Sequence, residues 1–196
     1  MEPKDKPIEI RWHGRGGQGA ITAAKVVAKA AFEAGYGGVV MAPSFGTERR
    51  GAPVSTSLKL ARDTIYDLSP ITRPDIVVVL DHLILNEVDV TAGLKPGGWL
   101  IVNAPCGPEA LRKGDYQVAT ANINQLAEQA GLKRHIVNSG IIGLLARATG
   151  LVDIERLARC LEEEFEGRRP QENARAARLS YDAAELAQTA GEVAHG

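Results

Sequence analysis

A glycine-rich segment at residues 14–19, with the sequence GRGGQG, constrains the fold of this chain more than any other feature. Residues 8–12, just before it, alternate apolar and polar side chains, which is typical of a β-strand. Residues 20–34, just after it, repeat their polar side chains at spacings of three and four, which predicts an amphipathic helix. A strand that passes through a short glycine turn into a helix is the opening unit of an α/β fold.

The rest of the chain continues this alternation of strands and helices. Strands are expected at residues 39–41, 54–60, 76–80, 99–102 and 116–120, and helices at residues 123–130, 141–149, 154–164 and 171–190. The alternating stretch 54–60 favours an antiparallel or edge position, whereas the wholly apolar stretch 76–80 favours a central parallel strand. We therefore predict an α/β fold, a three-layer α/β/α sandwich with a mixed, mostly parallel sheet and a helical C-terminal third. No linker or repeat divides the chain, so residues 1–196 are expected to form a single domain.

Composition excludes several classes of function. Lys plus Arg is 23 and Asp plus Glu is 24, and a net charge of −1 argues against binding to nucleic acid or to a membrane surface. The 2 cysteines, Cys106 and Cys160, cannot by themselves hold an iron–sulfur cluster or a cysteine-rich zinc site. No apolar run approaches the ~20 residues of a membrane span, and the charged residues 1–7 do not resemble a signal peptide. We expect a cytoplasmic protein.

The glycine segment has the pattern of a phosphate-binding turn but lacks the partners of the common nucleotide motifs. Its spacing matches G-x-G-x-x-G, in which glycines let backbone N–H groups approach a phosphate at a helix N-terminus. The acidic residue that would hold a ribose after the second strand is missing, since residues 41–43 read Met-Ala-Pro. No Lys-Ser or Lys-Thr pair follows Gly19, which excludes a Walker loop. The segment is either a contact to a ligand or partner, or only a tight turn. The candidate residues are Gly14, Arg15, Gly16, Gly17, Gln18 and Gly19.

Other polar residues could contribute to a site. Arg49 and Arg50, framed by glycines, could hold an anion or could form salt bridges in a surface loop. Asn138, just before a predicted helix, is a second candidate, although an N-cap role for it or its neighbour is the simpler interpretation. His13 is expected to act as a structural hydrogen-bonding group, and Asp81 either lines a site or caps a helix.

Two motifs taken together resemble a known family. Residues 8–20, IEIRWHGRGGQGA, are similar to the opening of the gamma subunits of pyruvate:ferredoxin oxidoreductase, in the 2-oxoacid:acceptor oxidoreductase gamma family. Residues 45–54, FGTERRGAPV, are similar to a second signature of these subunits, and residues 138–140 and 170–173 also fit. Thr47 stands where many relatives are expected to have proline. The resemblance covers nearly the whole chain.

The resemblance implies a gamma subunit of a multi-subunit 2-oxoacid:ferredoxin oxidoreductase. The reaction expected first for such an enzyme is the conversion of pyruvate and CoA to acetyl-CoA and CO2, with electrons passing to ferredoxin. The resemblance also implies that thiamine diphosphate, Mg and iron–sulfur clusters lie on the alpha, beta and delta partner subunits. This chain would then have no catalytic or metal-binding residue of its own. The glycine segment, Arg49, Arg50 and Asn138 would contact CoA or the partner chains.

Three alternatives remain open at this point. A related complex could use a branched-chain or aryl 2-oxoacid instead of pyruvate. The chain could be a purely structural adaptor whose loops only form interfaces. A stand-alone NAD-dependent dehydrogenase is disfavoured by the missing acidic residue after the second strand.

Overall fold

The computed structural model describes residues 6–43 and 50–188 of the chain. Its strands are β1 (Ile8–Arg15), β2 (Gly38–Pro43), β3 (Pro53–Ala61), β4 (Ile76–Val79), β5 (Trp99–Asn103), β6 (Gln117–Ala121) and β7 (Glu185–Ala187). Its helices are α1 (Ala20–Glu33), α2 (Ile123–Gln129), α3 (Asn138–Thr149), α4 (Ile154–Glu164) and α5 (Pro170–Asp182), with short 3-10 helices η1 (His82–Asn86) and η2 (Pro108–Leu111).

The strands form one mixed sheet in the order β2-β3-β1-β4-β5-β6-β7. Neighbours β1, β4, β5 and β6 are parallel, whereas β3 runs antiparallel to β1 and β2, and β7 runs antiparallel to β6. The prediction of an α/β fold with a mixed sheet is confirmed, and its neighbouring strand pairs divide into three parallel and three antiparallel pairs. β3 is antiparallel, as its alternating pattern indicates, and it lies between β2 and β1. The apolar β4 is buried at the centre of the sheet.

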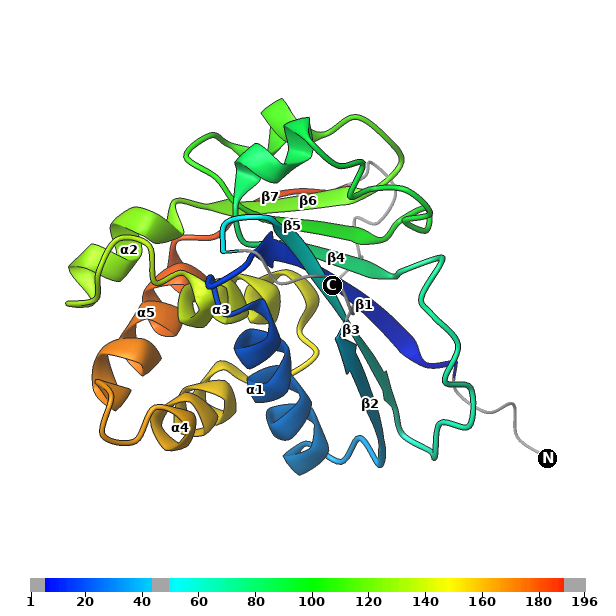
Figure 1. Ribbon diagram of the computed structural model, residues 1–196, viewed down its shortest axis with the longest axis horizontal. Coiled ribbons are helices and arrows are strands. Elements are labelled where there is room, and N and C mark those ends of the chain that lie inside the picture. The colour runs from blue at the N-terminus through cyan, green and yellow to red at the C-terminus, as the bar shows by residue number, and fades with distance from the viewer. Residues whose placement is uncertain (1–5, 44–49, 189–196) are drawn as a thin grey trace, which may run out of the picture.

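The two faces of the sheet are covered unequally (Figure 1). The α-helices α1, α3, α4 and α5 lie on one face, where Ile10 and Trp12 of β1 are fully buried in the larger core. The opposite face carries η1 and a second, smaller core over β4, β5 and β6. Because side chains alternate along a strand, Arg11, His13 and Arg15 of β1 point to that second face.

Several element boundaries differ from the sequence prediction, and the two that change the C-terminal helices matter most here. The last helix was expected to continue to residue 190, but α5 ends at Asp182 and residues 185–187 form β7 beside β6. The helix expected from residue 141 begins three residues earlier, at Asn138 with Val137 as N-cap, so the N-cap prediction for Asn138 is wrong. Asn122 does cap α2, because its side chain accepts a hydrogen bond from the Gln125 N–H. Both errors arise where contacts distant in sequence outweigh local preference.

Within residues 6–43 and 50–188, no helix combines the length and the apolar character that crossing a membrane requires.

Candidate ligand site at the glycine loop

The loop between β1 and α1 is built from residues 16–19. Gly17 and Gly19 have φ angles of 93° and 79°, in the left-handed region that favours glycine over every other residue. The Gln18 N–H donates to the Arg15 carbonyl at 2.9 Å, and the Gln18 side chain accepts from the Arg15 N–H at 2.8 Å. These two bonds close the loop. Gln18 therefore has a defined structural role within the chain.

A second pair of hydrogen bonds joins this loop to the segment before β3. The Gly16 N–H donates to the Ala52 carbonyl at 2.9 Å, and the Gly51 N–H donates to the Gly16 carbonyl at 3.1 Å. The two sequence motifs are therefore adjacent in space, and the exposed Arg50 stands directly beside Gly51. Arg49 lies outside the described residues.

The N-terminus of α1 is open to a ligand. Its N-cap Gly19 has no side chain to accept a hydrogen bond from the first turn, and that turn has no acidic residue. In the described part of the chain the N–H groups of Gly17 and Gly19 donate to no acceptor. Free N–H groups and the positive end of a helix dipole favour an anion at this position.

Asn138 lies against this loop. A Cβ added to Gly19 would come within 2.9 Å of Asn138 Nδ2, so only glycine permits this approach. Asn138 is 8% exposed, yet no contact within the described residues satisfies its amide. Its amide atoms are not fully buried, since within the described residues the buried side-chain polar atoms without a partner are Trp12 Nε1 and Ser180 Oγ, so the amide stays accessible to solvent and to a ligand. Asn138 is at the start of α3, so the N-termini of α1 and α3 converge here.

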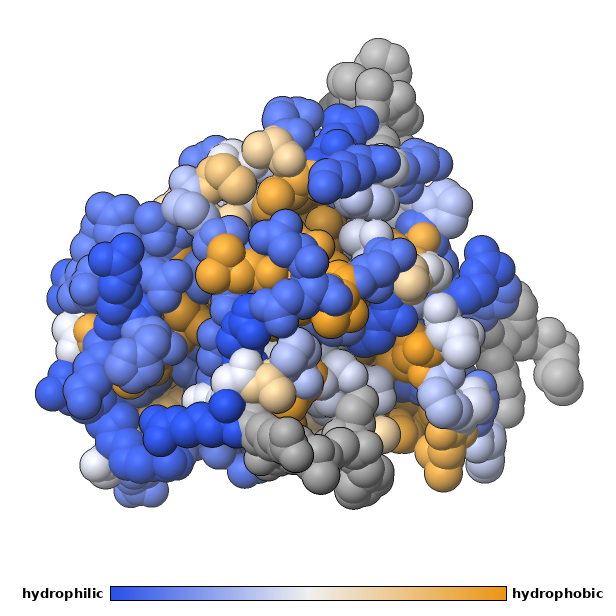
Figure 2. All heavy atoms as spheres, turned by 45° about the horizontal axis from the view of Figure 1, so that its top comes forward, coloured by the Kyte–Doolittle hydropathy of each residue, from blue (hydrophilic) through white to orange (hydrophobic). Residues whose placement is uncertain are grey.

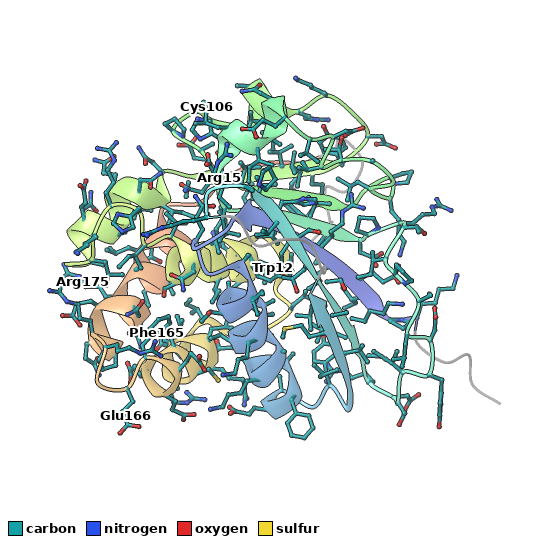
Figure 3. All side chains as sticks on the ribbon, viewed as in Figure 1. Trp12, Arg15, Cys106, Phe165, Glu166 and Arg175 are labelled. Carbon is teal, nitrogen blue, oxygen red and sulfur yellow. The ribbon has the colours of Figure 1, made fainter. Side chains whose placement is uncertain are left out.

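Arg15, which Figure 3 labels, is held by acidic residues of the same chain. Its Nε lies 2.7 Å from Asp81 Oδ2, one terminal nitrogen lies 2.5 Å from Glu87 Oε1, and the other donates to the Gly51 carbonyl at 3.2 Å. Hydrogen bonds from Arg15 lower the pKa of Glu87. Partial burial alone would raise the pKa of Asp81, but the bonds from Arg15 and the Leu83 N–H lower it. Arg15 thus fixes the loop against η1 and has little donor capacity left for a ligand.

Sequence reasoning did not identify Glu87. It is 72 positions from Arg15, and no motif surrounds it. The helix-capping interpretation of Asp81 is confirmed, because Asp81 accepts from the Leu83 N–H at the start of η1, and its carboxylate also holds Arg15.

His13 is buried behind this loop, and its structural role is confirmed. Its Nε2 accepts a hydrogen bond from Arg11 Nε at 3.2 Å, which places the ring proton on Nδ1. Burial, followed by the charge of Arg11, lowers the pKa of His13 to about 4. The imidazole is therefore neutral at physiological pH and does not donate a proton there.

Stability should fall as the pH drops from 6.5 toward 4, because the unfolded chain then binds a proton that folded His13 refuses. At about pH 4.5 this difference should amount to about 2–3 kcal/mol in the free energy of unfolding. Urea unfolding at several pH values would measure it. The His13→Asn variant, which has no titrating ring, is the control, and its profile should be flatter over this window. Parallel profiles for the two proteins would contradict the prediction.

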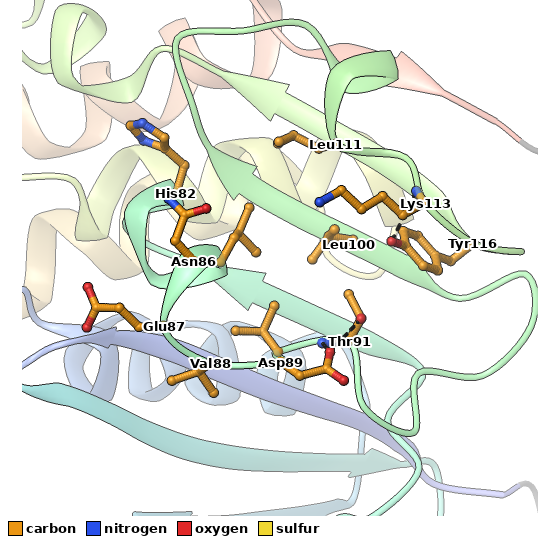
Figure 4. A pocket seen from close by; sticks show the side chains of 12 residues that line it. His82, Asn86, Glu87, Val88, Asp89, Thr91, Leu100, Leu111, Lys113 and Tyr116 are labelled. Carbon is orange, nitrogen blue, oxygen red and sulfur yellow. Dashed lines mark hydrogen bonds between the residues drawn. The ribbon is translucent and has the colours of Figure 1, made fainter.

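A cavity of about 450 Å3 opens on the other side of η1 (Figure 4). His82, Asn86 and Glu87 line one wall, and Lys113 extends from the opposite loop into the space between them. Figure 2 turns this side of the molecule forward and shows apolar patches among polar side chains. No residue of the glycine loop lines this cavity, so it is separate from the convergence of α1 and α3.

The described residues offer no cluster of three or more His, Cys, Asp or Glu side chains that could hold a metal ion. Cys160 is buried, and burial raises the pKa of its thiol to about 11, so it is not a nucleophile at neutral pH. The donors that this arrangement leaves available within the described residues are the N–H groups of Gly17 and Gly19 and the Asn138 amide, and the exposed Arg50 is adjacent in sequence to Gly51.

This chain is similar to known proteins over most of its length. The profile of the family described as Pyruvate ferredoxin/flavodoxin oxidoreductase matches residues 9–183. The common gamma subunit of the pyruvate/ketoisovalerate oxidoreductases of Pyrococcus furiosus is 45% identical over 185 residues, covering 91% of this chain and 98% of that protein. The crystal structure of pyruvate oxidoreductase subunit PORC from Thermotoga maritima has a TM-score of 0.81 at 34% identity, covering 94% of this chain and 100% of that one.

A more distant structure shares the fold alone. The 2-oxoglutarate:ferredoxin oxidoreductase from Magnetococcus marinus was solved with 2-oxoglutarate, coenzyme A and succinyl-CoA bound. It has a TM-score of 0.67 at 18% identity, and the likeness covers 91% of this chain and 30% of that one.

Proposed function

Because this chain belongs to the pyruvate ferredoxin/flavodoxin oxidoreductase family, as a gamma-type subunit, we propose that it completes the CoA-binding site of a multi-subunit complex. That complex converts pyruvate and CoA to acetyl-CoA and CO2 and passes two electrons to ferredoxin. Alpha, beta and delta subunits hold thiamine diphosphate, Mg and the iron–sulfur clusters. The work of this chain is to bind and orient, and the complex acts in the cytoplasm.

The observation that carries this proposal is the Asn138 amide beside the glycine loop, which makes no hydrogen bond to the residues that the structure describes. CoA offers phosphate oxygens and amide carbonyls, both of which accept hydrogen bonds from an amide N–H2 group. The N–H groups of Gly17 and Gly19, which donate to no acceptor among the described residues, suit a phosphate at the N-terminus of α1. Arg50 adds a positive charge next to the loop, and Arg15 keeps the loop in place from behind.

A distant relative in fold supports CoA as the ligand. The Magnetococcus marinus 2-oxoglutarate:ferredoxin oxidoreductase, which includes a region of this fold, binds coenzyme A and succinyl-CoA. The missing ribose-binding acid and the missing Walker lysine make nicotinamide and nucleoside triphosphate ligands worse fits for the same loop.

A second candidate substrate comes from the Pyrococcus furiosus relative. That protein is a common subunit of pyruvate and ketoisovalerate oxidoreductases. A subunit that serves two oxidoreductases cannot select the 2-oxoacid, so this chain would serve a branched-chain 2-oxoacid equally well. Its proposed role toward CoA is the same in both cases, since CoA is common to the two reactions.

In the assembled complex, Arg50→Ala should raise the apparent KM for CoA by about tenfold and leave kcat nearly unchanged. The loss of one charge-assisted contact to a phosphate accounts for a change of this size. Steady-state rates at varied CoA, with pyruvate saturating, give the measurement. Arg175→Ala is the control, because Arg175 is exposed on α5, far from Arg15 (Figure 3).

Two results would count against this role. If the Arg50→Ala complex assembled normally and kept its apparent KM for CoA, the CoA contact would be absent. If Arg50→Ala and Arg175→Ala raised that KM equally, the effect would reflect overall charge and not a site.

A further inference from the structure

A groove of about 510 Å3 lies on the second face of the sheet, away from the glycine loop. β1, β3 and β2 form its floor, and residues 68–71 form a wall. Apolar lining comes from Val40, Ala42, Leu68, Pro70 and Ile71. In the described part of the chain no helix covers this half of the second face, in contrast to β4, β5 and β6, which pack against η1 and its loops. The groove is therefore an uncovered section of an otherwise packed sheet.

Large apolar side chains stand exposed beside this groove. Leu68 is 71% exposed on its wall, and Tyr66, two residues earlier, is 79% exposed. Exposed apolar and tyrosine side chains around a concave surface are typical of protein–protein interfaces.

Two cations reach the floor of the groove, and one of them is already neutralised. Lys59 is buried, and its Nζ lies 3.4 Å from Glu9 Oε1 and 3.6 Å from Asp67 Oδ2. Arg11, on the neighbouring strand, is paired across the ladder with Ser57, so both side chains belong to the same face.

The charge of Arg11 has no such partner in the described part of the chain. Its three hydrogen bonds go to uncharged acceptors, namely His13 Nε2 at 3.2 Å and the Val90 and Ala92 carbonyls at 2.7 Å each. Burial lowers the pKa of Arg11, and Asp89 opposes this only by longer-range attraction. The Asp89 carboxylate is occupied by the N–H and hydroxyl of Thr91. A half-buried guanidinium without a carboxylate favours an anionic partner.

We propose that this groove docks a segment of a partner subunit that carries a carboxylate among apolar side chains, with the carboxylate on Arg11. This docking rests on the proposed function, since it requires the partner subunits of the complex. Charge complementarity favours an acidic partner, because within residues 6–43 and 50–188 no carboxylate forms an ion pair with Arg11 at the groove. The exposed Leu68 and Tyr66 would be covered by the apolar residues of the same segment.

The experiment measures binding of the labelled chain to the purified subassembly of alpha, beta and delta subunits. Leu68→Asp places a like charge beside the incoming carboxylate and should weaken the dissociation constant by at least about tenfold. Arg11→Gln should weaken it similarly and should also reduce its dependence on salt. Phe32→Asp is the control, because Phe32 is 65% exposed on α1 in the helix layer and should leave binding unchanged. Thermal unfolding of each variant verifies the fold.

The outcomes separate the two proposals. If the wild-type chain does not bind the subassembly, the proposed function fails and the docking fails with it. If the wild type binds and both groove variants bind equally well, the docking alone is overturned. Sedimentation of the isolated chain tests a second copy as the occupant. A dimer that Leu68→Asp dissociates would overturn the assignment to a partner subunit.

Discussion

Replacing Gly143 with alanine should destabilise the protein by about 3 kcal/mol, although the same change in an open helix would stabilise it by about 1 kcal/mol. Gly143 lies in the middle of α3 where that helix crosses α5. A Cβ there would stand 1.9 Å from the Ala177 carbonyl oxygen and 2.7 Å from its carbonyl carbon. Because the obstacle is backbone, no rotamer change relieves it, and the two helices must separate. Overpacking therefore outweighs helix propensity.

Thermal unfolding measures this effect, and a melting temperature lower by about 10 °C is expected for a domain of this size. Gly150→Ala is the matched control at the end of the same helix. Gly150 has a φ angle of 62° but nothing within 4 Å of an added Cβ, so the variant meets only backbone strain. Its cost should be about 1 kcal/mol. Equal losses for the two variants would show that the contact between α3 and α5 is not the cause.

The second large effect is expected at Asn173, which joins α5 to α3 through a buried polar contact. Asn173 Oδ1 accepts from the Ser139 hydroxyl at 2.6 Å, and its Nδ2 donates to the Arg169 carbonyl at 2.8 Å. Asn173→Asp keeps the shape and the acceptor but turns the donor into a charged oxygen facing a carbonyl. At neutral pH this should cost about 3 kcal/mol of unfolding free energy.

The pH dependence identifies the cause. Burial should raise the pKa of the introduced carboxyl above its value in the unfolded chain, so the deficit of Asn173→Asp should shrink as the pH falls and the group protonates. A protonated carboxyl can donate to the Arg169 carbonyl, as the amide does. Asn122→Asp is the control at the partly exposed N-cap of α2, where either side chain can accept from the Gln125 N–H. A deficit at Asn173 that does not change with pH would argue for a packing defect instead.

Much of the fold follows from local sequence patterns. The unit from β1 through the glycine loop to α1 is specified by alternation, glycine positions and helical spacing within about two dozen adjacent residues, so it was predictable. α4 was predicted with its observed limits, since Asp153 caps it at one end and its pattern stops at Glu164. The α/β class follows from the same local signals.

The errors occur where partners distant in sequence decide the local structure. The residue types at 185–187 are compatible with a helix. They form a strand instead, because pairing with the edge of β6 satisfies their backbone hydrogen-bonding groups. Asparagine is a common N-cap residue, but Asn138 is the first residue of α3 itself and packs against Gly19. β6 is distant in sequence from residues 185–187, and Gly19 is distant in sequence from Asn138, so local sequence patterns do not reveal either contact.

The candidate site divides in the same way. The sequence by itself determined that a glycine turn precedes α1, that it lacks the partners of common nucleotide motifs, and that arginines follow in a second glycine-framed loop. Only the tertiary structure decided that Arg15 pairs with Asp81 and Glu87 and that Gly16 joins Gly51 and Ala52. It also placed Asn138 against the loop, with no hydrogen-bond partner among the described residues. Helix and turn preferences act between adjacent residues, whereas these contacts depend on how the sheet brings distant segments to one edge.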